Sequence, residues 1–293
     1  MHPIFFSFPQ MEILGRTFGP LHIHAYGVML AVAFLFGLAL LVREGRRYKF
    51  SSDDMLDMTI YIIISSIIGA RIMYILLSIG DYSTDPLGAL KIYEGGLSQH
   101  GGVIGGFAGL ALFGWRKKYS IAALCDAAAP PLVLGSAIAR WGCFLNGCCY
   151  GAPWNGPFAV VFPSLGDGLP RHPAMLYDSF LHFALLGAMF ALRRFKRKDG
   201  DMVAFYLIGF AILRFITEIF RSGNTGVPVV GTITIAQLVS IPLIAAGIFI
   251  YTRPAKPAAA LPAKNNKKNS NPPKKTKDSS ASAPQKKKNK GKR

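Results

Sequence analysis

Seven long apolar segments dominate the chain between residues 24 and 251. Each one runs for about twenty residues with few charges, which is the length that an α-helix needs to cross the hydrocarbon core of a bilayer. The segments are 24–42, 58–79, 97–115, 121–139, 174–192, 202–220 and 232–251. This pattern predicts an all-α integral membrane protein with seven transmembrane helices.

Basic clusters lie between these segments and predict the orientation. They follow the first, third, fifth and seventh segments, so all of them fall on one side of the membrane. Their members are Arg43, Arg46, Arg47 and Lys49; Arg116, Lys117 and Lys118; Arg193, Arg194, Lys196, Arg197 and Lys198; and the basic C-terminal tail. Because Lys and Arg are enriched in cytoplasmic loops, we expect the N-terminus outside and the C-terminus in the cytoplasm.

The chain divides into three parts on this pattern. Residues 1–23 are typical of an interfacial segment at the membrane surface, and residues 24–252 form the seven-helix transmembrane domain. Two sizeable loops, at about 80–96 and 141–172, are expected on the outer side. Both have the composition of plain linkers, but the second is long enough to form a small outer cap.

The third part, residues 253–293, is a basic tail with no apolar period. It holds fourteen Lys and Arg and a single acid, Asp278, so it carries +13 of the formal net charge of +18. A segment of Lys, Asn, Pro, Ser and Ala cannot bury a core, and we expect it to be disordered in the cytoplasm. Its predicted partners are anionic lipid headgroups, and no nucleic acid is expected.

Polar side chains inside the apolar segments gather at one depth. In the predicted orientation nearly all of them lie just inside the outer surface, and only Asp126 falls on the cytoplasmic half. The outer group comprises Tyr26, Arg71, His100, Arg140, His172, Asp178, Arg214, Glu218, Arg221 and Gln237. Ionisable residues are unfavourable in a membrane and therefore indicate a functional site. The alternative is a set of separate structural ion pairs and interfacial residues.

One cationic face stands out in this group. Arg214, Glu218 and Arg221 are spaced i, i+4 and i+7, so they share one face of a helix. Glu218 stabilises one arginine, and this pairing alone would explain part of the pattern. Two arginines against one acid still leave positive charge, which with Arg140 and Arg71 fits an anionic headgroup held by charge-assisted hydrogen bonds.

His100 lies in a glycine-rich run, 98–106 (SQHGGVIGG). The glycines allow either tight helix packing or close approach of a ligand, and the histidine is as readily a structural residue as a functional one. The run resembles the oxyanion loop of esterases, but the chain has no G-x-S-x-G nucleophile motif. It also has no G-K-[ST] phosphate loop.

Three cysteines lie in the stretch 135–151 (GSAIARWGCFLNGCCYG). Cys143, Cys148 and Cys149 have no histidine pair at zinc spacing, so no metal site is predicted. A bridge from Cys143 to Cys148 or Cys149 is compatible with an oxidising side. Packing as small residues is the interpretation the spacing favours, and Cys125 is expected in the core.

Several short motifs follow one another in a fixed order. They are Ala25-Tyr26-Gly27, Gly69-Ala70-Arg71, 96–102 (GLSQHGG), 139–151 (ARWGCFLNGCCYG), Arg171-His172-Pro173, Leu176-Tyr177 and Arg214-Phe215-x-x-Glu218-x-x-Arg221. In this order, from about residue 26 to about residue 240, the chain resembles the bacterial phosphatidylglycerol–prolipoprotein diacylglyceryl transferases.

The resemblance implies a transferase of the bacterial cytoplasmic (inner) membrane that acts in lipoprotein biosynthesis. The diacylglyceryl group of phosphatidylglycerol would pass to the thiol of the lipobox cysteine in a prolipoprotein signal peptide, forming a thioether and releasing glycerol phosphate. A thiol with an ordinary pKa of about 8.5 needs a base or a positive field, and a phosphate leaving group needs cations. No metal or cofactor is required, so none is expected.

The resemblance also assigns roles to residues. His100 becomes the candidate base, and Arg140 and Arg214 become the candidate phosphate clamps. The substrate-binding residues carried over are Tyr26, Arg140, Asn146, Gly151, Glu218 and Arg221. The expected site opens toward the periplasmic or outer leaflet.

The chain departs from the better-known proteobacterial pattern at three positions. That pattern has Asn, Glu and Tyr where Cys143, Cys148 and Phe210 stand, which puts in doubt any role for an amide at 143 or a carboxylate at 148. Two other functions compete with transfer. A transporter or channel for an anionic solute should show inverted repeats, and a lipid-binding scaffold would not need His100 beside arginines.

Overall fold

The computed structural model describes residues 3–8, 11–13, 16–82, 95–221, 228–230 and 233–254. Seven long helices there match the seven predicted segments. They are α1 (Ala25–Arg47), α2 (Ser52–Leu77), α4 (Gln99–Lys117), α5 (Ile121–Asn146), α6 (Ala174–Leu192), α7 (Asp201–Ile219) and α8 (Ile235–Thr252), with one extra turn, α3 (Ile79–Tyr82). The predicted basic tail lies outside the described residues from 255 onward, as does most of the predicted loop 80–96.

Six of these helices are long and apolar enough to cross a membrane, among the residues that the structure describes. The six are α1, α2, α5, α6, α7 and α8; α4, which begins with the sequence QHGGVIGG, is not among them. A mostly helical, multi-pass membrane protein is therefore confirmed. The seventh crossing and the orientation of the termini stay predictions.

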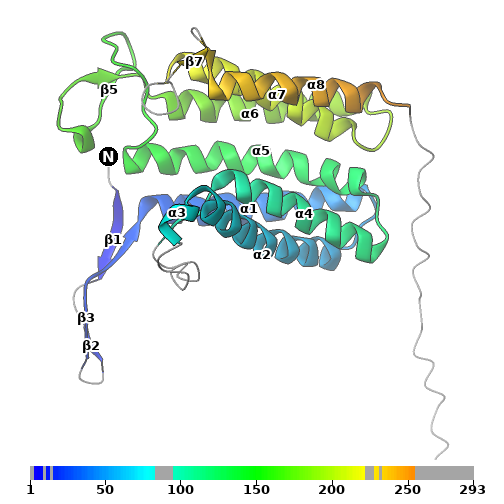
Figure 1. The fold of residues 1–293 in the computed structure, drawn as a ribbon, viewed down its shortest axis with the longest axis horizontal. Helices are drawn as coiled ribbons and strands as arrows, with labels where there is room; N and C mark the ends of the chain where they lie inside the picture. Colours follow the sequence, from blue (N-terminus) through cyan, green and yellow to red (C-terminus); the bar gives the residue numbers. More distant parts are fainter. Residues whose placement is uncertain are drawn as a thin grey trace, which may run out of the picture. The chain divides into compact units, whose positions relative to one another are not determined.

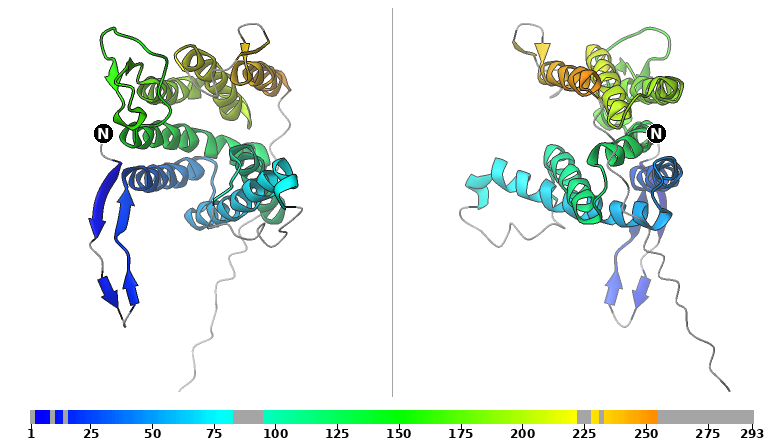
Figure 2. Two further views of the ribbon diagram at one scale, coloured as in Figure 1. Left: turned by 60° about the vertical axis from the view of Figure 1, so that its left-hand side comes forward. Right: turned by 90° about the vertical axis from the view of Figure 1, so that its right-hand side faces the viewer.

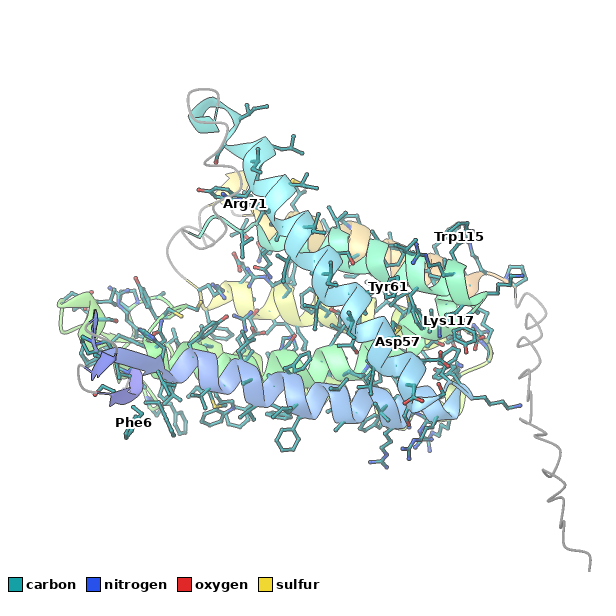
Figure 3. All side chains as sticks on the ribbon, turned by 90° about the horizontal axis from the view of Figure 1, so that it is seen from below. Phe6, Asp57, Tyr61, Arg71, Trp115 and Lys117 are labelled. Atoms are coloured by element: carbon teal, nitrogen blue, oxygen red, sulfur yellow. The ribbon has the colours of Figure 1, made fainter. Side chains whose placement is uncertain are left out.

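Helix α5 occupies the centre of the bundle. It packs on α1 along one side and on α6 and α7 along the other, while α8 packs on α7 (Figure 1). Helices α2 and α4 form a pair of their own. Figure 3 shows α2 running away from α1 toward its Arg71 end, so the two helices are closest near Asp57 and diverge from there.

Glycines set the spacing of the α2–α4 pair. A Cβ placed on Gly101 or Gly105 would overlap the backbone carbonyl of Gly69 or Ser65 on α2, and one on Gly109 would overlap the Ser65 side chain. Gly101, Gly105 and Gly109 recur every four residues and so lie along one face of α4. Most of the glycine-rich run therefore packs helix against helix and forms no phosphate loop.

Short-range capping determines where several helices begin. Ser51 accepts a hydrogen bond from the Asp54 N–H at 3.0 Å, and Ser120 accepts one from Ala123. Thr234 and Gln237 form a reciprocal capping box at the start of α8. The polarity of Gln237, which the sequence analysis grouped with the functional residues, is explained by this cap.

Asp126, the polar residue predicted on the other half of the membrane, has a structural role. Its side chain is fully buried and accepts backbone hydrogen bonds from Gly200 and Val203, each at 2.9 Å. These are orphan N–H groups at the start of α7, where a carboxylate also interacts favourably with the helix dipole. Asp126 therefore joins α5 to the beginning of α7.

The N-terminal region adds a β-hairpin to this mostly helical fold. Strand β1 (Ile4–Phe8) pairs antiparallel with β4 (Leu21–His24), and β2 (Met11–Ile13) pairs with β3 (Arg16–Phe18). Figures 1 and 2 show the hairpin projecting from the beginning of α1. Aromatic and β-branched residues in β1 favour extended backbone over helix. The interfacial position predicted for 1–23 is a separate expectation.

The predicted cap forms, with shifted bounds, and its position on the outer side stays a prediction. Helix α5 continues to Asn146, so the cap begins after it and includes β5 (Val160–Val161) paired with β6 (Pro170–Arg171) and a 3-10 turn, Pro163–Leu165. Trp154 stacks on His172 with ring centroids 4.2 Å apart. A second small pair, β7 (Pro228–Val230) with β8 (Ile233–Thr234), lies before α8.

Candidate functional site

Helices α5, α6 and α7 bring a cluster of charged side chains together at the cap end of the bundle. Arg140 on α5 forms an ion pair with Asp178 on α6, whose other oxygen lies 3.2 Å from His182 Nδ1. On α7, Arg214 Nη2 lies 2.7 Å from Glu218 Oε2. Asp178 and Glu218 are both 3% exposed. Buried carboxylates of this kind need such partners, because an unpaired buried charge is strongly destabilising.

The two ion pairs belong to one electrostatic group. Arg214 interacts through its charge with Arg140, Asp178 and Arg221 as well as with Glu218. Among the described residues, Arg214 Nη1 is a buried donor without a hydrogen-bond partner. The site therefore has an available guanidinium donor, which is a feature that binds an anion.

Gly151 and Arg221 connect the cap to the end of α7. The Gly151 N–H donates to the His172 carbonyl at 2.8 Å, and the Ala152 N–H donates to the Phe220 carbonyl at 3.0 Å. Gly151 and Arg221 face each other in an isolated antiparallel bridge. A Cβ at Gly151 would lie 2.7 Å from His172 Cβ, so this contact needs glycine. Gly151 thereby helps to place Arg221.

Tyr26 and Asn146 lie beside the same cluster. Tyr26, at the start of α1, packs on Gly142, where an added Cβ would be 3.2 Å from its ring. Tyr26 is also close enough to interact electrostatically with Arg140. Asn146, the last residue of α5, is exposed and hydrogen-bonds the Cys148 side chain. Seven of the eight predicted site residues are thus brought to one region.

The cysteines that follow α5 share this region. Cys143, Cys148 and Cys149 have sulfurs within 4.8 Å of one another, and all three are free thiols. A hydrogen bond from Cys143, together with the charge of Arg221, lowers the pKa of the Cys149 thiol to about 5. Burial raises the pKa of the Cys148 thiol. The disulfide considered from the sequence is not formed in this structure.

His100, the predicted base, lies apart from the arginines. It is exposed in the first turn of α4, and within the described ranges no hydrogen bond or ion pair joins it to Arg140 or Arg214. Arg71 organises the segment before it. The Arg71 side chain is buried and donates from Nη1 to the carbonyls of Gly95 at 2.7 Å and Gly96 at 3.0 Å (Figure 3 labels Arg71). Arg71 thus fixes the backbone at Gly95 and Gly96, in the segment that leads to His100.

An apolar pocket lies next to the charged cluster. Its volume is about 440 Å³, and it is lined by the cap and by α6, through Phe158, Ala159, Val160, Pro173, Leu176, Tyr177 and Phe180. Tyr177 directly precedes the buried Asp178, and Phe180 packs edge-on against Trp141, the neighbour of Arg140. A hydrocarbon chain in this pocket would lie beside a headgroup held by the arginines.

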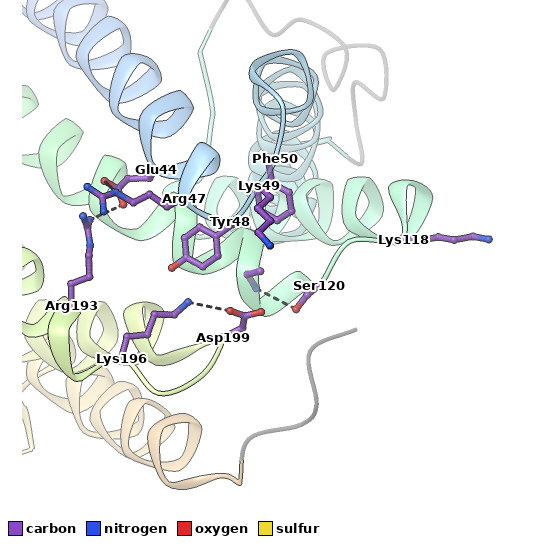
Figure 4. A pocket seen from close by; sticks show the side chains of 11 residues that line it. Glu44, Arg47, Tyr48, Lys49, Phe50, Lys118, Ser120, Arg193, Lys196 and Asp199 are labelled. Atoms are coloured by element: carbon purple, nitrogen blue, oxygen red, sulfur yellow. Dashed lines mark hydrogen bonds and ion pairs between the residues drawn. The ribbon is translucent and has the colours of Figure 1, made fainter. Parts of the chain in front are cut away.

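A second pocket, of about 390 Å³, lies at the opposite end of the bundle (Figure 4). Its charges are largely paired with one another. Glu44 is 3% exposed and lies 2.6 Å from Arg193 and 3.4 Å from Arg47, and Lys196 lies 3.1 Å from Asp199. The Glu44–Arg193 pair joins the last turns of α1 to the segment after α6. We interpret this pocket as a structural junction between the basic loops.

His182 belongs to the cluster but is not among the site residues predicted from the sequence. His182 is 3% exposed, and its Nε2 is a buried atom without a hydrogen-bond partner among the described residues. The available signal was its spacing of four residues from Asp178 inside an apolar segment, which places both on one helix face.

Comparison with known proteins identifies the family of this chain. A family model described as "Prolipoprotein diacylglyceryl transferase" matches residues 13–253. The phosphatidylglycerol–prolipoprotein diacylglyceryl transferase of Bordetella bronchiseptica is 35% identical over 261 residues, which cover 86% of this chain and 98% of that protein. The protein of the same name from Bacillus mycoides is 33% identical over 256 residues, covering 84% and 94%.

Proposed function

Given that the chain belongs to the prolipoprotein diacylglyceryl transferase family, we propose that Arg140 and Arg214 bind the phosphate of phosphatidylglycerol during diacylglyceryl transfer. The observation that carries this proposal is a buried donor beside a second arginine. Arg214 Nη1 has no hydrogen-bond partner in the described part of the chain, and Arg214 lies close enough to Arg140 for their charges to interact. A phosphate diester would supply the missing hydrogen-bond acceptor.

The reaction makes one bond and breaks one. The sulfur of the prolipoprotein cysteine attacks the glyceride carbon that carries the phosphate, the S–C bond forms, and the C–O bond to phosphorus breaks. Glycerol phosphate leaves with one more negative charge on its phosphate, and the thiol proton passes to a base. Because the charge on the phosphate grows along the reaction, Arg140 and Arg214 stabilise the transition state more than the bound substrate.

The base is assigned to His100 as part of the same proposal. An ordinary thiol has a pKa of about 8.5 and is mostly protonated at neutral pH. His100 is exposed at the first turn of α4, and Arg71 holds the segment that leads to it. We expect the substrate to lie between His100 and the arginines, since a bound peptide or lipid can span the distance that separates them.

The lipid chains have a place on the same side. The apolar pocket between the cap and α6 is lined by Phe180, which contacts Trp141, the neighbour of Arg140 in the chain, so we assign one acyl chain to it. Exposed apolar side chains on α4, including Val103 at 68% and Phe107 at 58%, suit contact with lipid. This supports a seventh crossing by α4, with the site in the outer leaflet and the basic loops in the cytoplasm.

The transporter or channel alternative has no support. The relatives described above are named as transferases. We also propose that the basic tail contacts anionic lipid headgroups. Residues 255–293 lie outside the described ranges, so this contact rests on the sequence.

Purified protein tests the proposal when it is mixed with phosphatidylglycerol vesicles and a peptide that carries a lipobox cysteine. We expect the peptide to gain the mass of one diacylglyceryl group. A peptide with Ser in place of the lipobox Cys is the control and should remain unmodified. Unchanged cysteine peptide in the presence of folded protein would rule the proposal out.

A further inference from the structure

Three cysteine side chains converge at the end of α5. We propose that Cys143, Cys148 and Cys149 form a Zn²⁺ site made of three thiolates. Their sulfurs lie within 4.8 Å of one another, and in the part of the chain that the structure describes they are the one group of metal-ligating side chains this close. The sequence predicted no metal here because it offered no histidine pair, but three sulfurs suffice when the backbone brings them together.

The backbone after α5 is bent in a way that gathers the sulfurs. Gly147 ends the helix in the left-handed conformation, and the Cys148 N–H returns to the Cys143 carbonyl at 3.1 Å. Cys149 also has a positive φ, 65°, which is uncommon for a residue with a side chain. Adjacent side chains in an extended segment diverge, whereas this bend turns Cys148 and Cys149 toward Cys143. Strain of this kind persists where the surroundings impose it and concentrates at binding sites.

The distances suit a thiophilic ion. Zn²⁺ binds thiolate sulfur at about 2.3 Å in tetrahedral geometry, which separates each pair of sulfurs by roughly 3.8 Å. The observed separations need to shorten by about 1 Å at most. Soft thiolate ligands favour Zn²⁺ over hard cations such as Mg²⁺. Three protein ligands leave the fourth position for water or another exchangeable ligand.

The surroundings match the charge of such a complex. Zn²⁺ with three thiolates carries one net negative charge. Arg140 lies close enough to interact with Cys143 through its charge, and Arg221 does the same with Cys149. Donors around the ligands stabilise a metal centre. Apolar side chains, including Phe162 and Met175, pack on the same cluster and limit the access of water.

A metal here would act on the position of the arginines. The three ligands fix the segment 143–149, and Gly151 follows it directly in its bridge with Arg221. Bound Zn²⁺ would therefore hold the end of α5, with Arg140, against the cap. This proposal concerns metal binding and does not depend on the transfer reaction.

The test uses the full-length chain in detergent with a non-thiol reductant and no lipid substrate. Zn²⁺ is added alone, free metal is removed, and bound zinc is measured by elemental analysis; Co²⁺ in a parallel sample reports thiolate ligation by its near-ultraviolet charge-transfer absorption. We expect one equivalent of Zn²⁺ per chain and the cobalt–thiolate band. Cys125→Ser is the matched control, because Cys125 lies near the other end of α5, outside the cluster.

The variants Cys149→Ser and Cys148→Ser should each lose the cobalt–thiolate band and most of the bound zinc, with folding checked by thermal unfolding. Two variants are used so that a folding defect in one does not decide the result. The proposal is overturned if the natural chain binds no zinc or if a folded serine variant binds as much as the natural chain.

Discussion

The charged residues of the site divide two tasks, which are positioning the arginines and binding the substrate phosphate. Asp178 and Glu218 keep Arg140 and Arg214 in place inside an apolar bundle. The carboxylates therefore position the cations, and a guanidinium donor of Arg214 is available to a substrate phosphate. Removing a carboxylate and removing an arginine should have different effects, the first on stability and the second on catalysis.

Asp178→Asn tests the positioning task. The change leaves Arg140 without its ion-pair partner beside the buried His182, so we expect the free energy of unfolding to fall by about 3 kcal/mol. Thermal or denaturant unfolding in detergent measures it. Asp167→Asn is the control, because Asp167 pairs with Arg171 on the exposed cap and its loss should change stability far less. Equal effects of the two changes would contradict the positioning role.

His100→Gln tests the proposed base. The variant must rely on thiolate that forms in solution, so its transfer rate should be about 100-fold lower at neutral pH and should rise with pH toward the thiol pKa of about 8.5. The rate of peptide modification between pH 6 and pH 9 measures this. Stability should be unchanged, because His100 is exposed. A full transfer rate at every pH would remove His100 from the mechanism.

At the scale of the element, the helices were predictable and the hairpin was not. Apolar runs of about twenty residues predicted all seven helices to within a few residues at most ends. A segment in lipid must satisfy its own backbone N–H and C=O groups, and a helix does so by internal hydrogen bonds. No comparable constraint acts on β1, whose short run of aromatic residues also suits an interfacial segment. Helix α5 is longer than the predicted segment 121–139. Its last turn, up to Asn146, contains polar and small residues, so the apolar pattern ends before the helix does.

The parts of the site that lie on a single helix could be predicted from the sequence. The spacing of Arg214 and Glu218 predicted their ion pair, which the structure contains. The partner of Arg140 is on another helix, and no local pattern could identify it. The same holds for the cysteines, whose meeting depends on the positive φ of Cys149.

The α2–α4 pair gives a prediction about an element. A Cβ on Gly105 would overlap the Ser65 carbonyl, so Gly105→Ala should separate the helices and lower the free energy of unfolding by about 2 kcal/mol. Gly187→Ala on α6 is the control, since an added Cβ there meets nothing within 4 Å. Unfolding in detergent compares the two variants. A stability loss in Gly187→Ala as large as in Gly105→Ala would contradict the packing argument.

On the scale of the whole molecule, the two ends of the bundle differ in charge and in role. One end carries basic loops whose charges are paired with Glu44, Asp54 and Asp199. The other end carries the cap, the apolar pocket and the arginine cluster. The proposed orientation, with the basic loops in the cytoplasm, would place this cluster toward the opposite leaflet.

Removal of residues 255–293 tests whether the basic tail contacts anionic lipid without taking part in transfer. These residues carry thirteen of the tail's fourteen basic side chains, and each Lys or Arg near an anionic surface contributes about 1 kcal/mol. A peptide of this segment should bind vesicles with anionic lipid, and its affinity should fall as salt is raised. The shortened protein should keep its transfer rate. Equal binding to neutral vesicles would contradict the proposed lipid contact.

The most direct test of the account compares one arginine from each end. Arg214 lies 2.7 Å from Glu218 and Arg193 lies 2.6 Å from Glu44, and the two side chains are 20% and 23% exposed. The measurement is kcat for diacylglyceryl transfer from phosphatidylglycerol to a lipobox peptide by Arg214→Gln and Arg193→Gln. We predict a loss of about 100-fold or more in Arg214→Gln, because a charge on the leaving phosphate loses its stabilising donor, and a rate within about twofold of the natural chain in Arg193→Gln. Equal rates in the two folded variants would contradict the claim that the arginine cluster holds the phosphate.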